Sequence, residues 1–457
     1  MDRFKRTPAR EEKLEDRITN FNEVCTGYDE DSALTEASRC LNCKNPKCKA
    51  NCPVNMSIPD FIASIKEKNY EEAARIIDKH SALSAICSRV CPQEKQCEGN
   101  CVLGIKGESI SIGNLERFVS DWARENNCEF LDKEEANGKK VAVIGSGPAG
   151  LTCARDLAKL GYEVTIFESM DVPGGILMHG IPEFRLPKKT IVKHEIEKVQ
   201  RVGVKIETGV TIGRDFTLDS LLNEKGFDAI FIGAGAGISK EMRIPGENAN
   251  GVYPGIDLLS SVNTNGGHSP LLKAGERLAV IGGGNVAMDV ARVAIRLGAK
   301  VQVVYRRSEE ELPAREVEIE HTKAEGAEFN FLTNPIEVLT DEEGKVTGMR
   351  CVKMALGEPD ESGRRRPVVV EGSEFVMEVD KVAMALGSDP STEVMEATNG
   401  VERTKWNSII IDEETGRTSN EKIFAGGDIV TGAETVIKAM SAGRKAAKAI
   451  DEYLKTI

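Results

Sequence analysis

A short apolar run followed by a glycine-rich turn begins near residue 141. The run Val141 to Ile144 leads into the turn Gly145 to Gly150, and residues 151–160 then place apolar side chains on one helical face. Gly161 ends this helix, and residues 163–167 form a second apolar run. Short continuous apolar runs are typical of buried parallel strands. The pattern predicts a βαβ unit.

The same pattern returns further along the chain. Residues 278–281 form an apolar run, the turn Gly282 to Gly284 follows, residues 286–297 read as a helix, and residues 300–304 read as a strand. Two such units spaced this widely indicate a duplicated α/β architecture rather than a solenoid.

The first 135 or so residues have a different texture, with few β-branched runs. Residues 70–80 place Ala73, Ile76 and Ile77 on one face, which predicts an amphipathic helix, and residues 112–126 look similar. The stretch Asn137 to Lys140 reads as a turn into a new domain. We therefore expect a helical domain before the α/β units.

Length and composition narrow the class of protein. A chain of 457 residues with 40% apolar content and 43 glycines indicates two or three domains with many tight turns. A net charge of −13 argues against a nucleic-acid partner. No apolar run approaches the roughly 18 residues of a membrane-spanning helix. Residues 1–13 lack the apolar segment of a secretory signal, so we expect a cytoplasmic protein.

Eight of the 12 cysteines form two dense groups. They are Cys40, Cys43, Cys48 and Cys52 in the first group and Cys87, Cys91, Cys97 and Cys101 in the second. Thiolates at such spacings, with proline following twice, predict iron–sulfur clusters. Zinc is the rival metal, but structural zinc sites usually pair two short Cys-x2-Cys elements, and only one is present. A disulfide framework would suit a small secreted domain instead.

The first glycine-rich turn is a dinucleotide fingerprint, because it lies between a predicted strand and a predicted helix. Its residues are Gly145, Gly147, Pro148, Ala149 and Gly150. The helix N-terminus offers amides to a pyrophosphate. Glu168, at the end of the next strand, lies close to the offset expected of a ribose-binding carboxylate. This segment predicts a nucleotide site.

A second fingerprint contains Gly282, Gly284, Asn285 and Val286. No acid follows its second strand directly; Arg306 and Arg307 stand there instead. Guanidinium groups at this place favour the 2′-phosphate of NADP over NAD. The alternative is that both arginines are solvated surface residues.

Two further segments are candidates for ligand contact. Residues 173–187 are rich in glycine and proline, which indicates a shaped loop over a ligand. Gly175 and Arg185 are candidate contacts of that ligand. His179 is either a proton donor or a structural residue. Near the C-terminus, Gly427 and Asp428 follow a strand, and Thr435 and Val436 begin a helix. The aspartate can bond a ribityl hydroxyl, and the helix dipole can stabilise a reduced flavin. An ordinary strand–turn–helix remains the alternative.

Taken together, these motifs resemble the small (beta) subunit of NADPH-dependent glutamate synthase. They are equally similar to the large subunit of the electron-bifurcating NADH-dependent ferredoxin:NADP oxidoreductase, and to the N-terminal half of dihydropyrimidine dehydrogenase. The resemblance implies an α/β fold with an N-terminal helical iron–sulfur domain and two Rossmann-like domains, the NADP domain inserted in the FAD domain. The implied domains are 1–137 (two [4Fe–4S] clusters), 138–270 (FAD, first part), 271–388 (NADP) and 389–457 (FAD, second part).

The resemblance also implies a ligand set. One cluster would be held by Cys40, Cys43, Cys48 and Cys101, and the other by Cys52, Cys91, Cys97 and Glu116. Cys87 would match a family cysteine that is not a ligand. FAD would bind the first fingerprint and NADP(H) the second.

The implied function is electron transfer from NADPH through FAD and the clusters to a second redox subunit. That partner would be the glutamate synthase large subunit, or a small flavoprotein subunit with ferredoxin in the bifurcating alternative. A thioredoxin-reductase-like enzyme is a remote alternative. Its redox Cys-x-x-Cys should lie in a nucleotide domain, whereas the Cys-x-x-Cys of this chain, Cys40 to Cys43, lies far upstream of both fingerprints. An electron carrier that has lost nucleotide turnover is another, although both fingerprints are intact.

Overall fold

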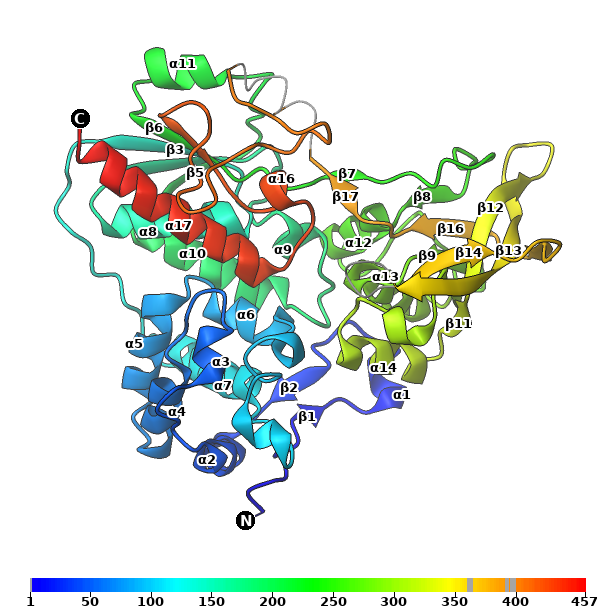
Figure 1. Cartoon of the computed structure of the whole chain (residues 1–457), viewed down its shortest axis with the longest axis horizontal. Helices are drawn as coiled ribbons and strands as arrows, with labels where there is room; N and C mark the ends of the chain where they lie inside the picture. Colours follow the sequence, from blue (N-terminus) through cyan, green and yellow to red (C-terminus); the bar gives the residue numbers. More distant parts are fainter. Residues whose placement is uncertain (1, 360–364, 391–393, 395–399) are drawn as a thin grey trace.

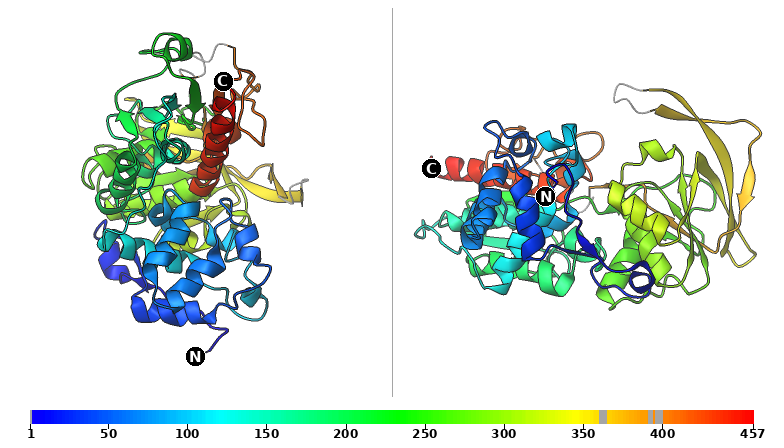
Figure 2. Two further views of the ribbon diagram at one scale, coloured as in Figure 1. Left: turned by 90° about the vertical axis from the view of Figure 1, so that its left-hand side faces the viewer. Right: turned by 90° about the horizontal axis from the view of Figure 1, so that it is seen from below.

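The computed structural model describes residues 2–359, 365–390, 394 and 400–457. The chain forms a helical N-terminal region and two parallel β-sheets covered by helices, with an antiparallel sheet at the far end (Figure 1). In the view from below, the second sheet and the antiparallel sheet form a lobe beside the rest of the molecule (Figure 2).

The N-terminal region is built from short helices. Its elements are β1 (Arg10–Glu11), α1 (Leu14–Arg17), β2 (Cys25–Gly27), α2 (Glu30–Arg39), α3 (Lys47–Ala50), α4 (Ile58–Lys66), α5 (Tyr70–His80), α6 (Ser84–Val90), η1 (Gln93–Lys95), η2 (Val102–Ile105) and α7 (Ile112–Glu125). The predicted helix 70–80 is confirmed with the same limits. The side chain of Asn69 caps it, accepting a hydrogen bond from the backbone N of Glu72 at 3.2 Å.

The first sheet has the order β18-β6-β3-β4-β5, and all its neighbouring strands are parallel. Its elements are β3 (Lys140–Ile144), α8 (Pro148–Lys159), β4 (Glu163–Phe167), α9 (Ile176–His179), the π-helix η3 (Lys188–Val192), α10 (Lys193–Arg201), β5 (Lys205–Glu207), α11 (Leu218–Asn223), β6 (Ala229–Ile232), β18 (Ile423–Ala425), α16 (Asp428–Thr431) and α17 (Val436–Leu454). The βαβ unit predicted from residue 141 is thereby confirmed.

The second sheet has the order β11-β10-β9-β16-β8 and is also parallel. Its elements are β8 (Val252–Pro254), α12 (Gly255–Thr264), β9 (Arg277–Ile281), α13 (Asn285–Arg296), β10 (Lys300–Tyr305), η4 (Glu309–Glu311), α14 (Glu316–Ala324), β11 (Glu328–Phe331) and β16 (Lys381–Met384). The antiparallel sheet consists of β12 (Thr333–Thr340), β13 (Val346–Pro359), β14 (Arg365–Val369) and β15 (Phe375–Met377).

The second sheet is inserted into the first. The chain leaves the first sheet after β6 along β7 (Ile238–Ser239) and returns to it along β17 (Ser388–Asp389). The strands β7 and β17 pair with each other. The last strand, β18, then pairs with β6 of the first sheet. This confirms the predicted fold class. The residue limits of the domains stay a prediction, and β8 lies in the second sheet although it precedes the limit predicted at 270.

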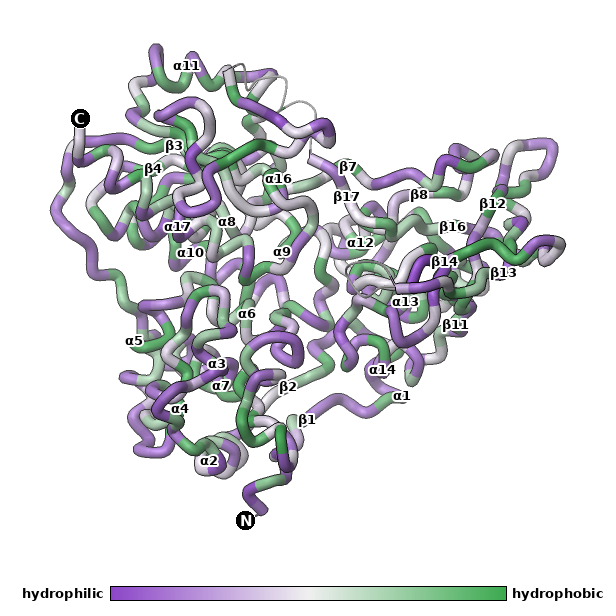
Figure 3. The backbone as a smooth tube through the Cα atoms, viewed as in Figure 1, coloured by the Kyte–Doolittle hydropathy of each residue, from purple (hydrophilic) through white to green (hydrophobic). Residues whose placement is uncertain are grey.

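The helical region and the first sheet share one hydrophobic core. Buried side chains of α4, α6 and α7 and those of β3, α8 and α17 belong to a single cluster. Apolar and polar positions alternate along α17 (Figure 3), as expected for a helix that buries one face, whereas α8 is buried on nearly all sides. The cysteine-bearing helices are therefore packed firmly against the first dinucleotide unit. Among the helices described, none is long and apolar enough to cross a membrane.

Candidate redox site

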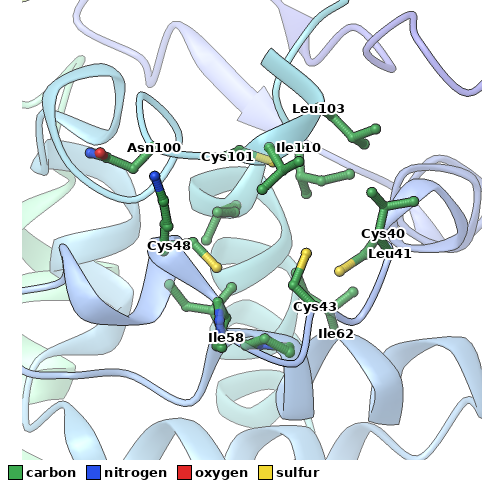
Figure 4. Close-up of a pocket in the computed structure, with 15 residues that line it drawn as sticks. Cys40, Leu41, Cys43, Cys48, Ile58, Ile62, Asn100, Cys101, Leu103 and Ile110 are labelled. Carbon is green, nitrogen blue, oxygen red and sulfur yellow. The ribbon is translucent and has the colours of Figure 1, made fainter. Parts of the chain in front are cut away.

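Four cysteines line one cavity in the helical region. Cys40, Cys43, Cys48 and Cys101 border it together with Ile58, Ile62 and other apolar residues, and it holds about 430 Å³ of space, part of which is open to solvent. Their side chains point towards one another across the cavity (Figure 4). Cys101 comes from the second sequence group, so the structure joins thiols from both groups.

The other predicted ligands lie together deeper in the molecule. Cys52, Cys91, Cys97 and Glu116 are close enough for their charges to interact, and Cys91 and Cys97 are buried. Burial and the charge of Glu195 raise the pKa of Glu116 to about 8. The Glu116 carboxyl has no hydrogen bond or ion pair to any residue described. An unpartnered carboxyl among three thiols fits an oxygen ligand to iron.

The thiols of Cys48 and Cys52 need a metal in order to be charged at neutral pH. Burial raises the pKa of Cys48 and that of Cys52 to about 11. Binding iron would therefore release protons from them. Within the residues described, no three His, Cys, Asp or Glu side chains are grouped as ligands of a single metal ion. The first four thiols surround a larger space instead.

The first fingerprint is held in shape by a polar residue inside its turn. The backbone N of Ser146 donates to Glu168 at 2.9 Å, the Ser146 hydroxyl donates to the same carboxylate, and the backbone N of Gly174 donates to that hydroxyl at 2.8 Å. At Gly150 a Cβ atom would lie 1.9 Å from the carbonyl oxygen of Gly145, so only glycine fits. The helix α8 begins at Pro148, within the fingerprint, and the free amides of its first turn are placed for a pyrophosphate.

The predicted ligand loop lies against this turn. A Cβ atom at Gly175 would be 3.2 Å from the Cα of Gly147. Arg185 at the end of the loop is buried in ion pairs with Asp289 and Glu318, so its cofactor contact stays a prediction. The His179 ring lies 3.3 Å from the Val172 carbonyl oxygen and 3.5 Å from the Ser260 hydroxyl, which fits the structural reading of this histidine.

The C-terminal segment brings a helix start to the same turn. A Cβ atom at Gly427 would lie 3.1 Å from the Cβ of Ala149. Asp428 accepts a hydrogen bond from the backbone N of Glu434 at 3.2 Å, and burial raises its pKa to about 6. Thr435 precedes the first residue of α17, and its buried hydroxyl has no partner in the part of the chain described. This orphaned hydroxyl at a helix N-terminus fits a polar cofactor such as FAD.

The second fingerprint leaves one guanidinium free. Gly282 approaches the backbone so closely that a Cβ would lie 2.3 Å from the Ala385 carbonyl oxygen, and α13 starts at Asn285. Arg306 follows β10, is exposed, and has no hydrogen bond or ion pair among residues 2–359, 365–390 and 400–457. The Nε of Arg307 donates to the Arg365 carbonyl oxygen at 3.0 Å. Arg306 is thus the better placed of the two for a phosphate.

Comparison with known proteins identifies the family. Residues 17–128 match the family described as dihydropyrimidine dehydrogenase domain II, 4Fe-4S cluster, and residues 139–443 match the pyridine nucleotide-disulphide oxidoreductases. The glutamate synthase [NADPH] small chain of Escherichia coli (strain K12) is 38% identical over 455 residues, which are 97% of this chain and 96% of the relative. The chain belongs to the glutamate synthase small-chain family.

Other members of this family have different names. The beta subunit of the NADP(+)-dependent formate dehydrogenase of Moorella thermoacetica is 41% identical over 433 residues, which are 89% of this chain and 60% of that subunit. Among solved structures, Mycobacterium tuberculosis FprA in complex with NADPH has a TM-score of 0.58 at 20% identity, covering 70% of this chain and 85% of FprA. That likeness shows the fold alone.

Membership of the small-chain family confirms several sequence predictions. The chain is an oxidoreductase, and FAD, NADP(H) and 4Fe-4S clusters are its cofactors. The role of each site residue stays a prediction. Sequence reasoning missed Ser146, because it occupies a variable position of the fingerprint, and Asp289, because Arg185 is 104 residues away along the chain.

Proposed function

We propose that this chain acts in the cytoplasm as the small subunit of a glutamate synthase, delivering electrons from NADPH through two [4Fe–4S] clusters to a large subunit. When bound, FAD accepts a hydride from NADPH, and the clusters carry single electrons. Sequence identity of 38% over nearly the full length of both chains supports this choice. The single observation that carries it is the lining of one surface cavity by four thiols.

Different residues would bind FAD and NADPH. The amides at the start of α8 and the orphaned Thr435 hydroxyl would hold FAD, and the N-terminus of α17 would favour negative charge on it. Arg306 would pair with the 2′-phosphate of NADPH. These side chains bind and orient, while the cofactors supply the chemistry.

The two thiol sets would act in series. The second set is next to α17, since the hydroxyl of Ser441 in that helix donates to the Pro53 carbonyl oxygen at 2.8 Å, and Pro53 follows Cys52. The first set is nearer the surface, in a cavity open to solvent. Electrons would therefore pass from the flavin to the second set, then to the first set, and out.

The surface around the first set has the character of a docking site. Leu41, Val102 and Ile105 are 43%, 40% and 79% exposed, which is unusual for apolar residues this close together. Lys44, Lys47 and Lys106 are exposed beside them and have no ion pair in the part of the chain described. On a chain with a net charge of −13, this basic patch fits an acidic partner surface.

The test reverses the charge of two lysines in this basic patch. The double variant Lys47→Glu with Lys106→Glu should weaken electron transfer to the large subunit about tenfold or more, because rim charges govern association. Reduction of ferricyanide by NADPH should be unchanged. Lys273→Glu with Lys300→Glu, on exposed lysines of the second-sheet lobe, makes the same change of charge as a control. Equal effects in both double variants would contradict the docking site.

The bifurcating alternative has a separate signature. If the true partner is a small flavoprotein subunit, NADPH should reduce ferredoxin only while NAD⁺ is also present. Glutamine-dependent glutamate formation with the large subunit, and no such NAD⁺ requirement, supports the proposal.

A further inference from the structure

Cys87 is the one cysteine of the two dense groups that the function above does not use. Its Sγ atom lies 3.2 Å from the Sδ atom of Met440, and the two residues are 1% and 0% exposed. Cys87 belongs to α6 in the helical region, and Met440 belongs to α17. The contact therefore joins the cysteine-bearing helices to the helix that starts at the proposed flavin site.

On one side, Cys87 faces a proposed ligand. Cys91 follows four residues later, its backbone N donates to the Cys87 carbonyl oxygen at 3.0 Å, and the two thiols interact. Cys91 comes directly after Val90, the last residue of α6. The Cys87 thiol is thus placed beside the sulfur that would bind iron.

On the other side, Met440 belongs to the part of α17 that lies near the first fingerprint. It lies one turn after Val436, the first residue of α17. Three residues later, Gly443 packs so closely on α8 that a Cβ would lie 2.2 Å from the Ala149 carbonyl oxygen. The sulfur pair therefore stands between the first fingerprint and the second thiol set.

Binding of iron decides where the Cys87 proton points. A cysteine bound to iron is a thiolate and has no proton to donate. The Cys87 S–H then has two acceptors, the Cys91 thiolate and the Met440 thioether. A charged acceptor makes the stronger hydrogen bond, so the proton turns to Cys91. The proton stays on Cys87 throughout, and only an electron enters the cluster.

We propose that Cys87 is a positioning residue that donates an S–H hydrogen bond to the iron-bound sulfur of Cys91 and raises the reduction potential of the second cluster, with Met440 fixing its side chain. Hydrogen bonds to cluster sulfurs are one of the features that set cluster potentials. A higher potential would favour electron entry from the flavin. The proposal rests on the ligand role of Cys91 in the proposed function, but not on the identity of the partner.

The test compares Cys87→Ser with Cys87→Val in the anaerobically purified, cofactor-loaded chain. Serine keeps a donor, and valine fills the space without one. Titration with dithionite and redox mediators, followed by electron paramagnetic resonance, measures both clusters without NADPH or a partner. We expect both variants to keep all iron, and Cys87→Val alone to shift one cluster to a more negative potential while the other cluster stays unchanged.

Three outcomes would overturn the proposal. Equal potentials in Cys87→Ser and Cys87→Val would show that no hydrogen bond is involved. Loss of one cluster in both variants would make Cys87 a ligand. A negative shift in Met440→Leu as large as that in Cys87→Val would assign the effect to the thioether. Failure of the glutamate synthase proposal would leave these potentials unaffected, so the two failures can be told apart.

Discussion

The Nη1 atom of Arg185 donates to both carboxylate oxygens of Asp289, at 2.8 and 2.7 Å. The pair joins the loop beside the first fingerprint to α13 of the second sheet. The Nε atom of Arg185 also lies 2.9 Å from Glu318 of α14. A buried charge network thus ties the two dinucleotide units together.

Removing the Asp289 carboxylate should destabilise the protein strongly. Asp289→Ala leaves a buried guanidinium short of one partner, which costs about 3–5 kcal/mol in comparable buried pairs. Urea denaturation followed by circular dichroism measures the free energy of unfolding. Lys448 and Glu452 form an exposed pair at 3.7 Å, and Lys448→Ala should cost less than about 0.5 kcal/mol. Similar costs for the two variants would show that the buried network adds no stability.

The sequence predicted local elements well and long-range partners poorly. Residues 163–167 are a strand with the predicted limits, because a continuous apolar run after Gly161 permits little else. The last helix begins at Val436 as predicted and extends to Leu454, because Ala446, Ala447 and Ile450 continue its buried face. The antiparallel sheet was not predicted, since its strands mix exposed and buried positions irregularly.

The grouping of the thiols lay beyond reasoning from spacing alone. The cysteines form two groups along the sequence, yet Cys101 lines the cavity of Cys40 and Cys43, and Cys52 lies with Cys91 and Cys97. Only the resemblance to known relatives implied this exchange. Spacing constrains neighbours along a helix or loop, whereas this exchange depends on how the segments that carry Cys52 and Cys101 pack against the other thiols.

Double variants test this grouping directly. Cys43→Ala with Cys101→Ala removes two thiols of one cavity, so the chain should lose about four of about eight irons, as expected for one of two [4Fe–4S] clusters. Cys52→Ala with Cys101→Ala removes one thiol from each set and should lose nearly all of them. Iron analysis of protein purified without oxygen decides the matter. A third double variant, Cys52→Ala with Cys43→Ala, also removes one thiol from each set. The grouping is wrong if this variant loses only one cluster while Cys43→Ala with Cys101→Ala loses both.

Arg306 should discriminate between the two nicotinamide cofactors. Its guanidinium is exposed and unpaired within the ranges described, whereas Arg307 is already hydrogen-bonded to the Arg365 carbonyl oxygen. A hydrogen bond to a charged group is worth about 1.5–3 kcal/mol, so Arg306→Ala should raise KM for NADPH about 10- to 100-fold. KM for NADH should hardly change. Arg350→Ala, on an exposed arginine of the antiparallel sheet, is the control. Equal losses with NADPH and NADH would refute a 2′-phosphate contact.

Lys188 should make stability depend on pH above neutrality. Burial lowers the pKa of this lysine to about 7, and its ammonium donates to the Leu186 carbonyl oxygen at 2.9 Å. In the unfolded chain its pKa returns to about 10.4. Between these values the unfolded state binds more protons, so the contribution of Lys188 to stability increases as pH rises from 7 to 10.

The variant Lys188→Met isolates this contribution. The wild-type free energy of unfolding should rise relative to that of the variant by on the order of 3 kcal/mol between pH 7 and pH 10. Because cysteines and tyrosines titrate in the same range in both proteins, the difference between the two curves is the quantity to measure. Lys189→Met, which removes an exposed neighbouring charge, should leave the curve parallel to that of the wild type. A Lys188→Met curve parallel to the wild type would mean that Lys188 keeps an ordinary pKa in the folded protein.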